Sequence, residues 1–147
     1  MAALFQFENY LLQLKREIEL FPDDESLWKI PEGIANSPGN LALHIAGNLQ
    51  HFIGANLGHT GYVRQREQEF SRQGLSKTMV LEELEKARQC TILVLGGLSS
   101  RDQSENYPQD FKGNFLSIGD ALSHLLAHLA YHTGQVNYLR RMLYPAV

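Results

Sequence analysis

Apolar residues recur at helical spacing along four segments of this 147-residue chain, and no segment alternates convincingly between apolar and polar residues as a half-buried strand does. This periodicity predicts an all-α fold, a four-helix bundle in which each helix buries one stripe against its neighbours. We expect residues 1–147 to form a single helical domain, because a chain of this length can enclose one core without disulfides or structural metals.

Turn residues and potential caps predict where the four helices begin and end. The expected spans are residues 4–20, 37–58 (or 61), 76–97 and 117–144. The last three spans each open on a serine that can cap a helix, and Pro38 suits the first helical position because it lacks an N–H. Pro22 and Pro145 mark where the first and last helices must stop, and Gly58 or Gly61 ends the second.

The connections between these helices are unequal. Residues 99–115 form a connection longer than the about 2–8 residues usual in bundles, and such a loop before the last helix tends to be a lid or a wall of a site. A short piece at residues 27–31 is expected to pack Trp28 against the bundle. The charged stretch 61–74 is either a solvated loop with local ion pairs, or a segment whose Tyr62 or Arg64 lines a site and contacts an anionic substrate.

Charge and cysteine content exclude several classes of protein. The formal charge of −3 and the pI of about 6.0 leave no basic surface for nucleic acid. Cys90 is the sole cysteine, so neither an internal disulfide nor a cysteine metal site can form, and we expect this side chain to pack within its helix. The chain shows no basic leader and no apolar run of about 18 residues, which predicts a cytoplasmic protein that does not enter membranes.

Three of the six histidines fall on the fourth expected helix, at His124, His128 and His132. Steps of four residues place them along one edge of the helix, and two imidazoles on consecutive turns can bind one metal ion. Leucines flank them, so this edge borders the buried stripe. The spacing alone is more often that of hydrogen-bonded core histidines than of ligands, and both interpretations stand at this point.

A metal site would need a third ligand from another helix. His44 and His51 lie seven residues apart on the second helix, about two turns or ~10 Å, so they cannot both join one ion with the fourth-helix pair. Both have apolar neighbours, and the residues alone leave the choice open. His59 lies at or beyond the helix end and is expected at the surface. No glutamate follows His128 as it would in a zinc protease, which excludes that class.

Three stretches of the sequence resemble the DinB/YfiT superfamily of metalloenzymes. Residues 36–49 read NSPGNLALHIAGNL, similar to the NS-x-GNL-x-LH-x-x-GNL of one branch. Residues 62–70 read YVRQREQEF, similar to that branch's Y-x-R-x-R-x-x-EF. Residues 128–136 read HLAYHTGQV, similar to the family's H-x-x-Y-H-R-G-Q followed by Ile or Val, the most specific of the three. In order and spacing the likeness covers nearly the whole chain.

The resemblance implies a metal triad and selects His44 over His51 as its third member. The implied ligands are His44, His128 and His132. His124 then becomes a residue of the core or beside the site, and Gln135 a group that supports a ligand or faces the substrate. The chain departs from the family at Thr133, where arginine is common, so an anion contact at that position is not expected.

Three neutral imidazoles leave a divalent ion with uncompensated charge and an open coordination position, the pattern of a catalytic site. Zinc or nickel is the expected ion. The resemblance implies an enzyme that acts on a small molecule, with transfer of a low-molecular-weight thiol as the leading reaction and hydrolysis as an alternative. A metal-binding or stress-response protein without turnover, and histidines that only pack, are further alternatives. Family members commonly pair, so a homodimer is also expected.

Overall fold

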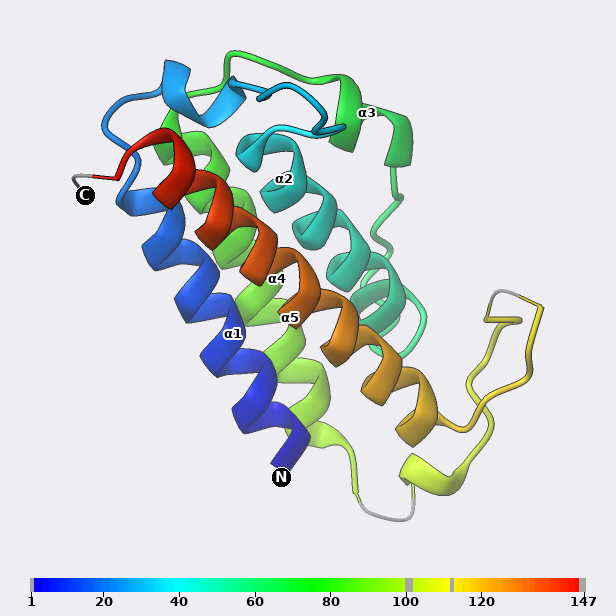
Figure 1. Ribbon diagram of the computed structural model, residues 1–147. Helices are drawn as coiled ribbons and strands as arrows, with labels where there is room; N and C mark the ends of the chain where they lie inside the picture. The colour runs from blue at the N-terminus through cyan, green and yellow to red at the C-terminus, as the bar shows by residue number, and fades with distance from the viewer. Residues whose placement is uncertain (1, 100–101, 112, 146–147) are drawn as a thin grey trace.

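The computed structural model describes residues 2–99, 102–111 and 113–145, and over these residues the fold is helical (Figure 1). Within this part of the chain the β pairing consists of two isolated bridges, one between Asn106 and Ser117 and one between Phe111 and Asn114. The elements in order are α1 (Ala2–Glu19), the 3₁₀ turn η1 (Glu25–Trp28), α2 (Pro38–Leu49), the π-helix η2 (Gln50–Ala55), α3 (Arg66–Ser71), α4 (Lys77–Gly97), the 3₁₀ turn η3 (Asp102–Ser104) and α5 (Ile118–Leu143).

The four long helices enclose one core. Helices α4 and α5 each contact both α1 and α2, so α1 and α2 lie at opposite corners of the arrangement (Figure 1). Along α1 the buried stripe follows helical spacing, with Phe7, Leu11, Leu14 and Ile18 fully buried. None of the helices among the described residues is long and apolar enough to cross a bilayer.

Serine caps open three of these helices at the predicted positions. The hydroxyl of Ser37 accepts a hydrogen bond from the backbone N–H of Asn40 at 3.1 Å, which satisfies one of the N–H groups that a helix start leaves unpaired. Ser76 and Ser117 do the same for α4 and α5. The predicted helix starts are therefore confirmed, together with the physical reason for them.

The second helix differs from the prediction in its last part. Regular α-helix stops at Leu49, and the chain continues as a π-helix through Ala55. Backbone hydrogen bonds that skip five residues mark the wider turn, for example from the N–H of Asn56 to the carbonyl of His51 at 3.1 Å. Such a turn takes up one extra residue, so side chains beyond Leu49 leave the face that an α-helix would give them. The helical conformation ends before Gly58, and His59 is in the left-handed region at φ 51°.

Helix α2 is buried along its whole length, because a further segment covers the side that faces away from the core. Every residue from Pro38 to Leu49 is buried. The covering segment includes α3, which the sequence had indicated only as part of a charged stretch, and it lies along the outer side of α2 (Figure 1). Asn40 holds it in place by donating from its side-chain amide to the carbonyls of Glu69 and Arg72, at 3.0 and 2.8 Å.

The segment before α2 packs as the sequence predicted. Trp28 contacts the core and donates its indole N–H to the carbonyl of Leu75 at 3.0 Å. Its ring lies so close to Gly39 that an added Cβ would approach within 2.7 Å. Glycine at this position therefore lets the indole lie directly on the first turn of α2.

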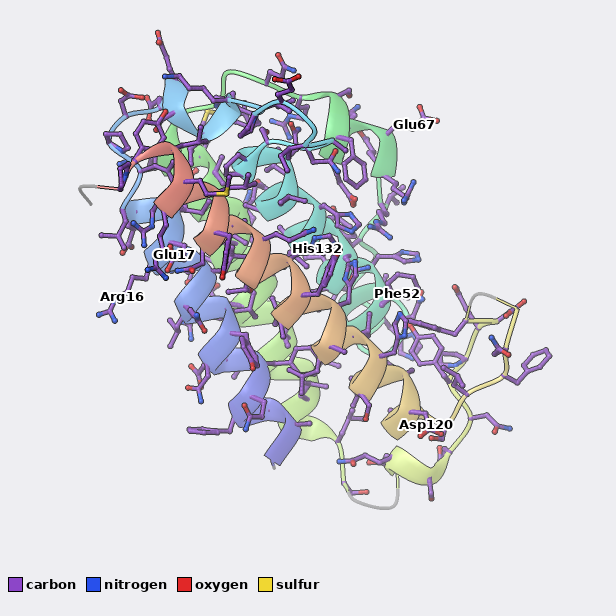
Figure 2. All side chains as sticks on the ribbon, in the orientation of Figure 1. Arg16, Glu17, Phe52, Glu67, Asp120 and His132 are labelled. Carbon is purple, nitrogen blue, oxygen red and sulfur yellow. The ribbon has the colours of Figure 1, made fainter. Side chains whose placement is uncertain are left out.

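The long connection before α5 is anchored to η2 by aromatic residues. Tyr107 and Phe111 are buried, and the ring of Phe111 packs against that of Phe52 with 5.0 Å between centroids (Figure 2). The Tyr107 hydroxyl donates to the carbonyl of Phe52 at 2.7 Å and accepts from the Asn56 amide at 3.0 Å. Burial raises the pKa of Tyr107 to about 12, so this hydroxyl stays protonated as a donor. Tyr107 and Phe111 thus fasten the described part of the connection to η2.

A buried ion pair joins α1 to α5. Glu17 accepts from Nε of Arg140 at 2.6 Å and from the side-chain amide of Asn137 at 2.8 Å (Figure 2). Both charged residues are only 6% exposed. A buried carboxylate and guanidinium stabilise the fold only while they are together, because each alone carries a large desolvation cost.

Replacing Glu17 with alanine is expected to lower the free energy of unfolding by about 3–5 kcal/mol, because the buried Arg140 loses this carboxylate. Urea denaturation followed by circular dichroism measures the change, with the exposed Glu19→Ala as the matched control on the same helix. Combining Glu17→Leu with Arg140→Met removes both charges and should recover most of the loss. A double variant as unstable as the single one would show that an uncompensated charge is not the cause.

Candidate metal centre

Three histidines from two helices converge between α2 and α5. Nε2 of His128 lies 3.1 Å from Nε2 of His44 and 3.1 Å from Nε2 of His132. Among the described residues these three form a group in which one potential ligand atom from each lies within 4.8 Å of the others. Figure 2 shows His132 on the side of α5 that faces α2.

The three imidazoles meet by their edges. The planes of His44 and His128 are inclined by 84°, those of His44 and His132 by 87°, and those of His128 and His132 by 89°. Rings that are mutually near-perpendicular do not stack, so their in-plane nitrogen lone pairs can point at one shared region. His44 is buried and the two α5 histidines are partly exposed, which leaves the cluster open on the α5 side.

A hydrogen bond within α5 sets the orientation of His132. Its Nδ1 lies 2.7 Å from Oε1 of Gln135. Because a carbonyl oxygen only accepts, Nδ1 carries the proton and Nε2 presents a lone pair to the cluster. Burial lowers the pKa of His132 below its ordinary value, and the hydrogen bond to Gln135 offsets this only in part. The ring is therefore neutral at neutral pH, as a metal ligand must be.

A carboxylate on α3 supports His44 from the other side. Oε2 of Glu69 lies 3.4 Å from Nδ1 of His44, and Arg64 grips the same carboxylate with Nε and Nη2 at 2.7 and 2.9 Å. Nη2 of Arg64 is also 3.4 Å from Nδ1 of His44 and can donate to it when that nitrogen carries no proton. In the tautomer with the proton on Nδ1, Glu69 accepts it and Nε2 of His44 presents its lone pair to the cluster.

The environment of Glu69 favours its charged form. Burial alone would raise the pKa of this carboxyl, but hydrogen bonds from His44 and Arg64 outweigh burial and hold the pKa below its ordinary value. Gly47, on the turn of α2 after His44, makes room for the side chain, since a Cβ there would lie 2.4 Å from Oε1 of Glu69. Glycine at this position is therefore required for the carboxylate to reach the imidazole.

The donor set fits a divalent cation. A neutral imidazole nitrogen either donates one hydrogen or accepts with one lone pair, so hydrogen bonds among the rings cannot satisfy Nε2 of His128 toward both neighbours. One cation could receive all three lone pairs. Ligands of a tetrahedral ion with bonds of about 2.0–2.1 Å lie about 3.3 Å apart, close to the two separations of 3.1 Å. The three histidines could together hold a metal ion.

Other residues singled out by the sequence lie around this group. His51 is half-buried on η2, with its ring against Phe52 at 4.8 Å, and His59 is exposed. His124 is exposed and packs edge-on against Phe111 of the long connection. Tyr62 is half-buried and lines a small pocket beside Glu69, and burial raises its pKa. None of these four belongs to the group of three.

Thr133, which follows His132, faces the core. It is 1% exposed, and its hydroxyl donates to the carbonyl of Leu129 at 2.8 Å. The hydroxyl is thus satisfied within α5, and Thr133 places no side chain at the opening of the cluster.

Sequence reasoning missed the role of Glu69. Its charged neighbours indicated a solvated loop, although Glu69 is only 6% exposed. The available signal was the presence of Arg64 and Glu69 in one motif, YVRQREQEF, and the glycine that follows His44 by three residues. A glycine on the face of a buried helix leaves space at that position, which indicates that another group approaches the helix closely there.

The fold and the group of three histidines describe a helical protein with a candidate metal centre between two helices. Over residues 1–146 the chain matches the model of a family described as protein of unknown function (DUF1572). Because the match spans nearly the whole chain, the protein belongs to that family. No curated protein matches the sequence.

Replacing Gly47 with alanine is expected to displace Glu69 and lower the free energy of unfolding by about 1–3 kcal/mol, the cost of breaking buried hydrogen bonds. Gly134→Ala is the matched control, since a Cβ at that helical position meets nothing within 4 Å. The variants are compared by urea denaturation. In a Glu69→Ala background the Gly47→Ala replacement should no longer destabilise, and an undiminished effect would mean that Gly47 acts through another contact.

Proposed function

We propose that this protein is a metal-dependent enzyme that holds one divalent ion, zinc or nickel, with His44, His128 and His132. We further propose that it is a four-helix bundle of the DinB/YfiT superfamily, with α1, α2, α4 and α5 as the bundle. The observation that carries the proposal is the convergence of three Nε2 atoms from two helices, two pairs of them 3.1 Å apart.

The groups behind the histidines support a site for a metal. Ligand imidazoles in metalloproteins usually donate their second N–H to a carboxylate or a carbonyl, which fixes the tautomer and the orientation of the ring. Glu69 and Gln135 stand in that position behind His44 and His132. A histidine that only packs in the core needs hydrogen-bond partners for its ring nitrogens. It has no need to direct its second nitrogen at two further imidazoles.

The residues of the chain define what such a site could do. A divalent ion bound there would supply Lewis acidity and stabilise an anionic nucleophile such as a thiolate or hydroxide. The buried His44 side excludes water, and the partly exposed His128 and His132 leave the α5 side for a substrate. Arg64 and Glu69 hold His44 rigidly in place while a substrate binds or leaves.

Transfer of a low-molecular-weight thiol to an electrophile is the reaction that we propose. Its support is the likeness to the superfamily together with the group of three histidines, and the thiol substrate itself would be the nucleophile. Cys90 does not compete for this role, because it is half-buried on α4 and burial raises the pKa of its thiol. At neutral pH this thiol is protonated and a poor nucleophile.

The purified protein is expected to contain about one divalent ion per chain, and His44→Ala and His128→Ala should each lose it, because two imidazoles alone bind weakly. Elemental analysis of native-purified protein measures the content. His51→Ala is the matched control and should retain the ion. Full occupancy in either ligand variant, or loss in the control, would refute the assigned triad.

Glu69→Gln is expected to bind the metal about 10–100-fold more weakly than the parent protein, because His44 loses the carboxylate that orients it. Competition with a chromogenic chelator measures the affinity. Glu67→Gln, on the exposed side of α3, provides the matched control. Equal affinities for the two variants would show that Glu69 does not support the site.

Metal-loaded protein is expected to consume a thiol in the presence of a generic electrophile, and metal-free protein and His128→Ala should not. Loss of free thiol is followed with bacillithiol, mycothiol, glutathione and coenzyme A as donors. Turnover of an ester substrate in place of thiol consumption would favour hydrolysis. A metal-loaded protein inactive in both assays would favour a metal-binding role without turnover.

A further inference from the structure

A pocket of about 550 Å³ opens beside the histidine cluster, between α5 and the segment that leads into α2. This volume lies within the range of roughly 300–1,000 Å³ typical of small-molecule sites. His132 and Gln135 belong to its lining, so the pocket begins where the cluster is open. A ligand in this pocket can direct one group toward the histidines.

The rest of the lining is apolar or neutral. Its large side chains are Ile34, Leu41, Tyr131, Tyr138, Leu139 and Met142. Apart from His132, the polar side chains among them and their neighbours are amides and phenols. No lysine, arginine, aspartate or glutamate of the described residues lines the pocket. A charged substrate body would therefore be desolvated there without a partner, which is unfavourable.

Three of these side chains lie along one face of α5 and are unusually exposed for their size. Tyr131, Tyr138 and Met142 are 64%, 68% and 66% exposed. Their spacing of seven and four residues places them on the same side of the helix, in the part of α5 that also carries His132 and Gln135. An apolar surface of this kind beside a polar cluster is typical of a site that binds a ligand with an apolar body.

A second pocket near the cluster has a different character. It has about 220 Å³, includes Glu69, Glu83 and Arg72 in its lining, and none of the three histidines. Of these charged groups, Glu69 already contacts His44. A substrate there would meet Glu69 and not the open side of the cluster, so the uncharged pocket is the better candidate.

We propose that this uncharged pocket binds the non-reacting part of the substrate, and that this part is an apolar or aromatic group without formal charge. The proposal rests on the proposed function, because the substrate's single reactive group, such as a thiol, is directed to the histidine site. It favours a neutral aromatic thiol or electrophile as the occupant over peptide-like or nucleotide-like thiols with several charges.

The test compares benzyl mercaptan with its para-carboxylate, two probes that differ by one charge at the end remote from the sulfur. Isothermal titration calorimetry on zinc-loaded protein should show benzyl mercaptan binding at least about tenfold tighter, because the carboxylate finds no partner. Tyr138→Ala should weaken the binding of benzyl mercaptan by about tenfold or more and leave the zinc content unchanged. Leu93→Ala, an exposed apolar residue on α4, is the matched control and should bind as the parent does.

Equal or tighter binding of the carboxylate, or no effect of Tyr138→Ala, would overturn the proposal. So would a Tyr138→Ala variant that changes from dimer to monomer by size-exclusion chromatography, because this face would then be an interface between copies. A chain that holds no divalent metal ion would refute the proposed function alone. The preference of the pocket is then measured on metal-free protein by saturation-transfer NMR with benzyl alcohol and para-(hydroxymethyl)benzoate. Tighter binding of benzyl alcohol supports the proposal, and equal or tighter binding of the carboxylate overturns it.

Discussion

The contact between Glu69 of α3 and His44 of α2 is the interaction on which the arrangement of the site depends. A helix buried on all sides must satisfy its polar side chains through its neighbours. For His44 the neighbours are α5 on one side and α3 on the other, and glycine at position 47 allows the carboxylate of Glu69 to approach. Asn40 holds the covering segment at the required distance. The site is thus built from three layers, α3, α2 and α5, and the middle layer, α2, carries His44.

Much of the fold was predictable because its signals are local. Serine caps and prolines depend on a few adjacent residues, and the starts of α2, α4 and α5 follow from them. The steps of four residues in α5 likewise indicated that His128 and His132 share an edge. The family match over residues 1–146 agrees with a likeness that extends along the chain.

The remaining features depend on contacts between distant segments, which residue spacing cannot show. Periodicity left His44 and His51 equivalent, and the choice of His44 came from the resemblance. The wider turn of η2 has no sequence signature, yet it changes the register of the side chains that follow it. The sequence leaves the stretch around Glu69 open between a solvated loop and a segment that lines a site, because burial under a short helix is a tertiary property. The long connection gave no sign that Tyr107 would anchor it to η2.

The partner of His132 lies three residues along the same helix, whereas that of His44 lies 25 residues away on α3. The orientation of His132 is therefore set wherever α5 is helical, whereas that of His44 also draws on the docking of the short α3. Small peripheral helices open locally at a lower free-energy cost than core helices. The orientation of His44 is therefore the part of the site that local opening would disturb first, while the α5 pair keeps its geometry.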